Sequence, residues 1–144
     1  MGDQEGETGA SVDVVMRWYE ALAGDDLPAV ARLSTSGVEV RYPGRGLLPY
    51  GGAWHGHDGL VRWAEAHDEA EEIFKFRIDS TVEQLDRVVV LGTFEGRARD
   101  AGRTWTTAFA HALTVSDGRV ERLEAYFDTA AAVDALSAPA GERS

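Results

Sequence analysis

Residues 106–115, TTAFAHALTV, have the alternating side-chain pattern of a β-strand and contain one imidazole, that of His111. Alternation with a period of two predicts a strand with one buried face, which His111 shares with Trp105, Thr107 and Phe109. A histidine has an ordinary pKa of about 6.5, so it can exchange a proton near neutral pH. Burial among aromatic rings favours its neutral form. His111 is therefore either the reactive group of a small enzyme or a core histidine bonded to a carbonyl or a tyrosine hydroxyl.

Tyr42 is the second candidate for chemistry. It ends the stretch GVEVRYP, whose alternation puts Val38, Val40 and Tyr42 on one side of a strand. A phenol can donate a hydrogen bond to a developing oxyanion or an epoxide oxygen while a histidine handles the other proton. The alternative is an ordinary half-buried strand tyrosine.

Other reactive groups are few. The chain has no cysteine, which excludes disulfides, thiolate nucleophiles and cysteine-ligated metals. The cluster EAHDEAEEI, residues 65–73, is interpreted as a solvated helical face, with His67 and likewise His57 exposed to water. A metal site would need ligands that converge. Neither a phosphate-binding glycine loop nor a nucleophile elbow is present, so we expect no metal and no organic cofactor.

The formal charge of −11 argues against nucleic-acid partners and acidic membrane surfaces, because both are bound by clustered basic residues. No run approaches the roughly 20 apolar residues of a membrane span, and the acidic start MGDQEGETGA lacks the features of a signal peptide. We therefore expect a cytoplasmic protein.

These residues need a scaffold, and the length of 144 residues with 44% hydrophobic residues suits a single domain. Helical spacing of apolar residues begins at Ser11, a cap candidate, and irregular tails are expected over 1–10 and 137–144, leaving a domain at 11–136. DDLPAVARL predicts a short second helix capped by Asp26, and a third helix runs from Asp58 toward Glu72. A last helix, TAAAVDAL, begins at Asp128 or Thr129.

Four strands follow the third helix: FKFRIDSTVEQ, RVVVLGTFEGRAR, TWTTAFAHALTV and RVERLEAYF. Residues 44–56 form a glycine-rich but apolar loop, from which Tyr50 and His55 could close over a ligand. Helices first and antiparallel strands afterwards give an α+β fold, in which a curved antiparallel sheet forms a cone around helices. The open end of such a cone is a natural pocket.

Three segments in this order resemble the SnoaL-like group of the nuclear transport factor 2-like superfamily: RWYEALAGDDLPAVARL, AWHGHDGLVRW and HALTVSDGRVERLEAYFDTAAAVDAL. That group includes ketosteroid isomerase, limonene epoxide hydrolase and polyketide cyclases. The resemblance implies a cystatin-like α+β barrel with an interior pocket, and a homodimer formed through the outer face of the sheet. Enzymes and plain binding domains share this fold.

The resemblance also assigns positions. His111 falls where ketosteroid isomerase keeps a protonated aspartate in its oxyanion hole, and where some polyketide cyclases keep a histidine. Tyr42 falls where that isomerase has its aspartate base. Ala125 falls where limonene epoxide hydrolase and aldol-type cyclases place an essential aspartate. Because alanine cannot activate water, epoxide hydrolysis is disfavoured.

The resulting expectation is a cofactor-independent isomerase, cyclase or dehydratase acting by acid–base catalysis on a hydrophobic small molecule such as a polyketide or terpenoid intermediate. His111 and Tyr42 would be catalytic. The expected binding wall comprises Trp18, Tyr19, Tyr50, His55, Trp63, Phe94, Trp105, Phe109, Ala125 and Phe127. Alternation along the last strand places three polar residues on the outside of the cone: Glu124, Tyr126 and Asp128. The alternative is a non-catalytic small-molecule-binding or dimerisation domain of the same fold.

Overall fold

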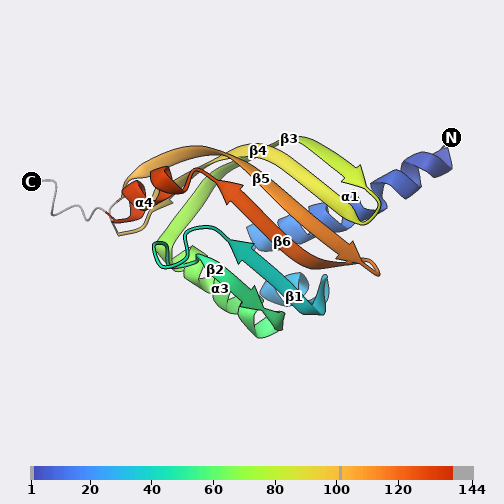
Figure 1. The fold of residues 1–144 in the computed structure, drawn as a ribbon, viewed down its shortest axis with the longest axis horizontal. Helices are drawn as coiled ribbons and strands as arrows, with labels where there is room; N and C mark the ends of the chain where they lie inside the picture. Colours follow the sequence, from blue (N-terminus) through green and yellow to red (C-terminus); the bar gives the residue numbers. More distant parts are fainter. Residues whose placement is uncertain (1, 101, 138–144) are drawn as a thin grey trace, which may run out of the picture.

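The computed structural model describes residues 2–100 and 102–137, which form an α+β domain with a curved, unclosed sheet (Figure 1). The helices and strands occur in the order α1 (Gly2–Ala23), α2 (Leu27–Arg32), β1 (Ser34–Tyr42), β2 (Gly52–His55), α3 (Gly56–Ala70), β3 (Glu71–Gln84), β4 (Arg87–Ala98), β5 (Thr104–Ser116), β6 (Arg119–Phe127) and α4 (Thr129–Ser137). The predicted fold class is confirmed.

The six strands lie in the order β2-β1-β6-β5-β4-β3. The long neighbours β3 to β6 pair antiparallel, as the alternating sequences predict. The predicted antiparallel pairing does not extend to β1 and β6, which are parallel, with Val40 opposite Leu123. Helix α1 passes behind the sheet and α3 lies along β1 and β2 (Figure 1). The concave face is therefore enclosed by helices.

Helix α1 begins at Gly2, so the structure continues it through most of the segment 1–10 that was expected to be irregular. Ser11 lies inside the helix and not at its cap, and its backbone amide donates to Glu83 Oε2 at 3.2 Å. A helix that is already nucleated extends at low cost, which is why weak apolar periodicity did not mark its start. Of the tail expected at 137–144, residues 138–144 lie outside the described residues.

Aspartate side chains cap the short helices α2 and α4, as predicted. The carboxylate of Asp26 accepts from the amide of Ala29 at 3.2 Å at the start of α2. Asp128 rather than Thr129 caps α4, accepting from the amide of Ala131 at 3.1 Å. These bonds satisfy amides that the helix itself leaves free.

The segment expected as one long loop, 44–56, ends in strand β2, which pairs antiparallel with β1. Helix α3 ends at Ala70, earlier than the sequence suggested, and Glu71 already starts β3. The turn at this junction carries Glu71 into the interior, where the residue is 1% exposed. No helix in the described part of the chain is long and apolar enough to cross a membrane.

Candidate functional site

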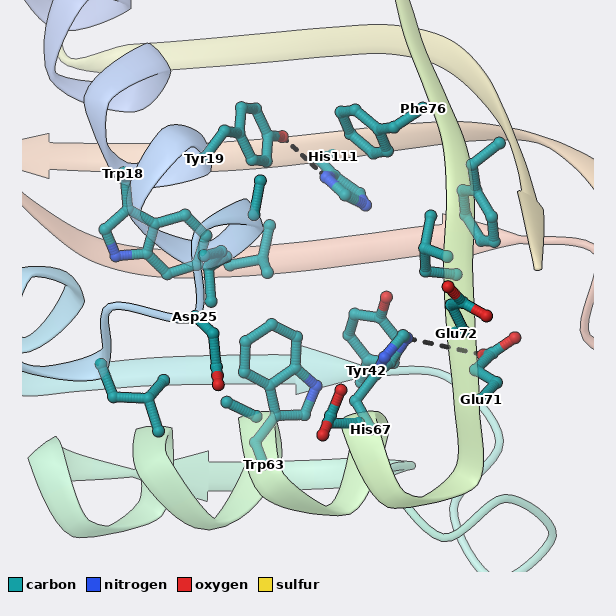
Figure 2. A pocket seen from close by; sticks show the side chains of 18 of the residues that line it. Trp18, Tyr19, Asp25, Tyr42, Trp63, His67, Glu71, Glu72, Phe76 and His111 are labelled. Atoms are coloured by element: carbon teal, nitrogen blue, oxygen red, sulfur yellow. Dashed lines mark hydrogen bonds and ion pairs between the residues drawn. The ribbon is translucent and has the colours of Figure 1, made fainter. Parts of the chain in front are cut away.

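A cavity of about 500 Å³ lies between α1, α3 and the concave face of the sheet (Figure 2). Aromatic side chains from α1, α3 and the sheet form part of its walls, and Trp18 stacks on Trp63 with ring centroids 6.4 Å apart. Its titratable lining is richer than the sequence suggested. The residues with polar groups in the lining are Trp18, Tyr19, Asp25, Tyr42, Trp63, His67, Asp68, Glu71, Glu72, Arg99 and His111.

His111 projects from β5 into this region and is 5% exposed. Its Nδ1 atom lies 2.7 Å from the hydroxyl of Tyr19, which α1 supplies. Burial, together with the nearby His67, lowers the pKa of His111 to about 3, so the imidazole is neutral at neutral pH. The partner that orients His111 is thus Tyr19 and not Tyr42.

The second ring nitrogen of His111, Nε2, is buried and has no hydrogen-bond partner among the described residues. Burial raises the pKa of Tyr19, so its phenol keeps its hydrogen. When the phenol donates to Nδ1, the single proton of the neutral imidazole lies on Nε2. In that tautomer His111 offers one N–H that no group in residues 2–100 and 102–137 accepts.

Tyr42 lines the cavity from β1 with its hydroxyl directed toward the side where His111 lies (Figure 2). Its ring contacts Trp63 at 5.3 Å and the ring of His67 at 5.9 Å between centroids. Burial and the neighbouring Glu71 raise the pKa of Tyr42, so it remains a hydrogen-bond donor at neutral pH.

Glu71 is the buried carboxyl group of the cavity, and its side chain has no exposed surface. Its Oε1 accepts from the indole of Trp105 at 2.7 Å, and its Oε2 accepts from the hydroxyl of Tyr50 at 2.6 Å. Burial raises the pKa of Glu71 above its usual range, although the two donated hydrogen bonds oppose this effect. A carboxylate offers about four acceptor positions, and Tyr50 and Trp105 use one on each oxygen.

His67 stands beside Glu71, with its Nε2 atom 3.5 Å from Glu71 Oε2 (Figure 2). Burial lowers the pKa of His67 to about 4, so the imidazole beside Glu71 is neutral at neutral pH. The interpretation of residues 65–73 as wholly solvated is therefore wrong for His67 and Glu71. Both side chains lie in the interior, because α3 ends at Ala70, between the two residues, and β3 starts at Glu71.

The space for the Glu71 carboxylate depends on Gly96 of β4. A Cβ atom at this position would lie 2.5 Å from Glu71 Oε1 and 2.9 Å from Trp105 Nε1. Ile73 pairs with Gly96 across the strands, which brings the start of β3 close to β4. The absent side chain thus makes room for the acid and its donor.

At the rim, Asp68 pairs with Arg99 at 3.1 Å and Glu72 with Arg97 at 3.4 Å. Asp25 also faces the opening. Within residues 2–100 and 102–137, no three His, Asp or Glu side chains form a group suited to a metal ion.

The structure brings six of the predicted site residues to the cavity: Trp18, Tyr19, Tyr42, Trp63, Phe94 and His111. Four others pack in the core behind it and are absent from the cavity lining: Trp105, Phe109, Ala125 and Phe127. Tyr50 is also absent from the cavity lining, and its hydroxyl donates to Glu71 Oε2. His55 lies elsewhere, because strand β2 at the sheet edge leaves its side chain 70% exposed beside Glu39.

Neither Glu71 nor His67 was predicted from the sequence to line the cavity. One signal was available: the alternation of β3, extended backward from Ile73, puts Glu71 on the inner face. The bond between Tyr19 and His111 spans 92 positions of the sequence, and no local pattern indicates it.

A family model for the SnoaL-like domain matches residues 15–123. The chain belongs to the SnoaL-like family. Among proteins with curated functions, none matches the sequence of this SnoaL-like domain.

Solved structures agree with this assignment. The SnoaL-like domain is 30% identical to a nuclear transport factor 2-like protein of unknown function from Burkholderia pseudomallei, with a TM-score of 0.82 over 90% of this chain and 98% of that one. It is 28% identical to a nuclear transport factor 2-like protein from Burkholderia xenovorans, with a TM-score of 0.83 over 90% and 97%. It is 27% identical to TerC co-crystallized with polyporic acid, with a TM-score of 0.77 over 90% and 99%.

Proposed function

We propose that this SnoaL-like protein is a cofactor-independent enzyme that isomerises, dehydrates or cyclises a mostly apolar small molecule, such as a polyketide or terpenoid intermediate, by proton transfer. One observation carries the proposal: a buried carboxyl group with a raised pKa and a buried neutral imidazole line the same aromatic cavity. Perturbed titratable groups in a cavity are typical of catalytic sites.

In this mechanism Glu71 is the general base. A base works best when its pKa lies near the operating pH, and burial moves the Glu71 carboxyl in that direction. The hydrogen bonds from Tyr50 and Trp105 fix its position. Glu71 would remove a proton from the carbon next to a carbonyl group, and the same carboxyl group would return that proton at another carbon.

The charge that develops on the carbonyl oxygen needs a donor. His111, with Tyr19 holding Nδ1, offers Nε2–H from β5, and Tyr42 offers its phenol from β1. Donors fixed in a cavity that excludes water stabilise such an oxyanion more strongly than water does. Relative to the expectation from sequence, His111 becomes the donor and Glu71 takes over the role of base.

The test is exchange of the α-hydrogens of 2-tetralone, an apolar bicyclic ketone, with D2O, followed by proton NMR. We expect the protein to accelerate exchange, and Glu71→Gln and His111→Gln to lower the rate by about a hundredfold or more. His55→Gln, which changes an exposed histidine, is the matched control and should leave the rate unchanged. Exchange at the buffer rate would favour the non-catalytic binding domain.

The proposal includes a homodimer formed through the outer face of the sheet. Leu91 of β4, Ala110 of β5 and Tyr126 of β6 are neighbours in register on that face, with Leu91 40% and Tyr126 58% exposed. Light scattering coupled to size exclusion should give twice the monomer mass, and Leu91→Arg should give the monomer. A monomeric wild-type protein would refute this part.

A further inference from the structure

We propose that the cavity takes a flat, uncharged molecule with two carbonyl-type oxygens, one bound by Nε2–H of His111 and the other by the indole N–H of Trp63. The inference rests on the proposed function, because it names the class of substrate for the same cavity. Quinones and polycyclic diketones have this chemistry.

Two buried side-chain atoms in the described part of the chain lack a hydrogen-bond partner: Nε1 of Trp63 and Nε2 of His111. Both residues line the cavity. The indoles of Trp18, Trp54 and Trp105 all donate to protein acceptors, at 2.9, 3.0 and 2.7 Å. Native proteins pair nearly all buried polar groups, so two exceptions at one cavity point to a ligand that supplies the acceptors.

The chemistry of the two atoms defines what they bind. An indole nitrogen only donates, and the Nε2 atom of His111 donates when Tyr19 donates to Nδ1. Two donors require two acceptors on the ligand. The carboxylates of Asp25, Asp68 and Glu72 at the rim disfavour an anion, since the nearby guanidiniums of Arg97 and Arg99 are already paired. Neutral carbonyl oxygens satisfy both conditions.

The shape of the cavity sets the distance between these oxygens. Trp63 projects from α3 and His111 from β5, on opposite sides of the space (Figure 2). The ring of Trp18, stacked on Trp63, and the ring of Tyr42 line the cavity beside them. Flat aromatic walls favour a flat ring system with an oxygen at each end.

Indole signals in a ¹H–¹⁵N correlation spectrum test the proposal without turnover. The probes are menadione, a methylated 1,4-naphthoquinone, and 2-methylnaphthalene, which has the same carbon skeleton without the oxygens. The chain has four tryptophans and no cysteine, so four indole signals are expected and no thiol can react with the quinone. Trp63→Phe identifies the Trp63 signal by its loss.

We expect menadione to move the Trp63 indole proton downfield, as a new hydrogen bond does, and 2-methylnaphthalene not to do so. The Trp63→Phe variant should bind menadione about three- to tenfold more weakly and 2-methylnaphthalene equally well. Trp54→Phe is the control, because the Trp54 indole bonds to Tyr50 O and lies outside the cavity lining.

Three results would overturn the inference: no binding of menadione, equal affinity for the hydrocarbon, or binding that leaves the Trp63 signal in place. The proposed function fails separately. Binding of menadione without exchange of 2-tetralone would refute the enzyme and keep the ligand class. Exchange of 2-tetralone that depends on Glu71, without the response of the Trp63 signal to menadione, would keep the enzyme and refute the ligand class.

Discussion

Acid should destabilise this protein through His111, and the size of the effect follows from its burial. The pKa of His111 is about 3 in the folded chain against an ordinary value of 6.5. The unfolded chain therefore binds more protons between these two values, so stability is complete above pH 6.5 and falls as the pH falls toward 3. Going from pH 7 to pH 5 should cost about 2 kcal/mol from this one residue.

Urea unfolding at pH 7 and pH 5, followed by tryptophan fluorescence, measures this loss in the free energy of unfolding. In His111→Gln the loss between the two pH values should be about 2 kcal/mol smaller than in the wild type. His55→Gln, with its exposed side chain, should lose as much as the wild type. The raised pKa of Glu71 acts in the opposite direction and favours the folded state as the pH falls. Because the wild type and His111→Gln both contain Glu71, its contribution cancels in the difference between them.

Equal losses in the wild type and His111→Gln would contradict this prediction, since they would mean that His111 titrates alike in the folded and unfolded chains. If the slope of the free energy of unfolding against urea concentration changes with pH in both proteins, the unfolding is no longer two-state at one of the pH values.

Three further predictions concern stability and local packing. Tyr50→Phe removes a 2.6 Å bond to the buried Glu71, so the free energy of unfolding at pH 7 should fall by about 1–3 kcal/mol; a loss below 0.5 kcal/mol would contradict the role of Tyr50. Gly96→Ala places a Cβ atom 2.5 Å from Glu71 Oε1 and should shift the indole NMR signal of Trp105, whereas Gly37→Ala meets no atom within 4 Å and should leave it unmoved. Asp26→Ala removes the cap of α2 and should cost about 1 kcal/mol in urea unfolding; an unchanged midpoint would show that the bond to Ala29 contributes nothing.

The periodic parts of the sequence predict most of the fold. Strict alternation puts Trp105, Phe109 and His111 on the inner face of β5, and the structure buries all three. Asp26 and Asp128 cap helices as their chemistry predicts, because capping is a local interaction that depends on a few neighbouring residues. Alternation also keeps Glu124 outside, where it pairs with Arg41 and Arg87.

The site is less predictable, because its chemistry depends on contacts between distant segments. Glu71 lies in a run of charged residues that is typical of a solvated helix, and only the end of α3 at Ala70 turns it inward. Its donors, Tyr50 and Trp105, come from a loop and from β5. Tyr19 was expected in the binding wall, but its bond to His111 depends on how α1 crosses the sheet.

The proposed chemistry requires His111 to be a neutral imidazole that offers Nε2–H to the cavity while Tyr19 donates to Nδ1. Long-range ¹H–¹⁵N NMR of the histidine rings measures both charge and tautomer directly, with His111→Gln identifying the signals. We predict the neutral Nε2–H form at pH 7 and still at pH 5, and a change in the Nδ1 resonance in Tyr19→Phe. A doubly protonated ring at pH 5, or the Nδ1–H tautomer, would rule out this donor role of His111.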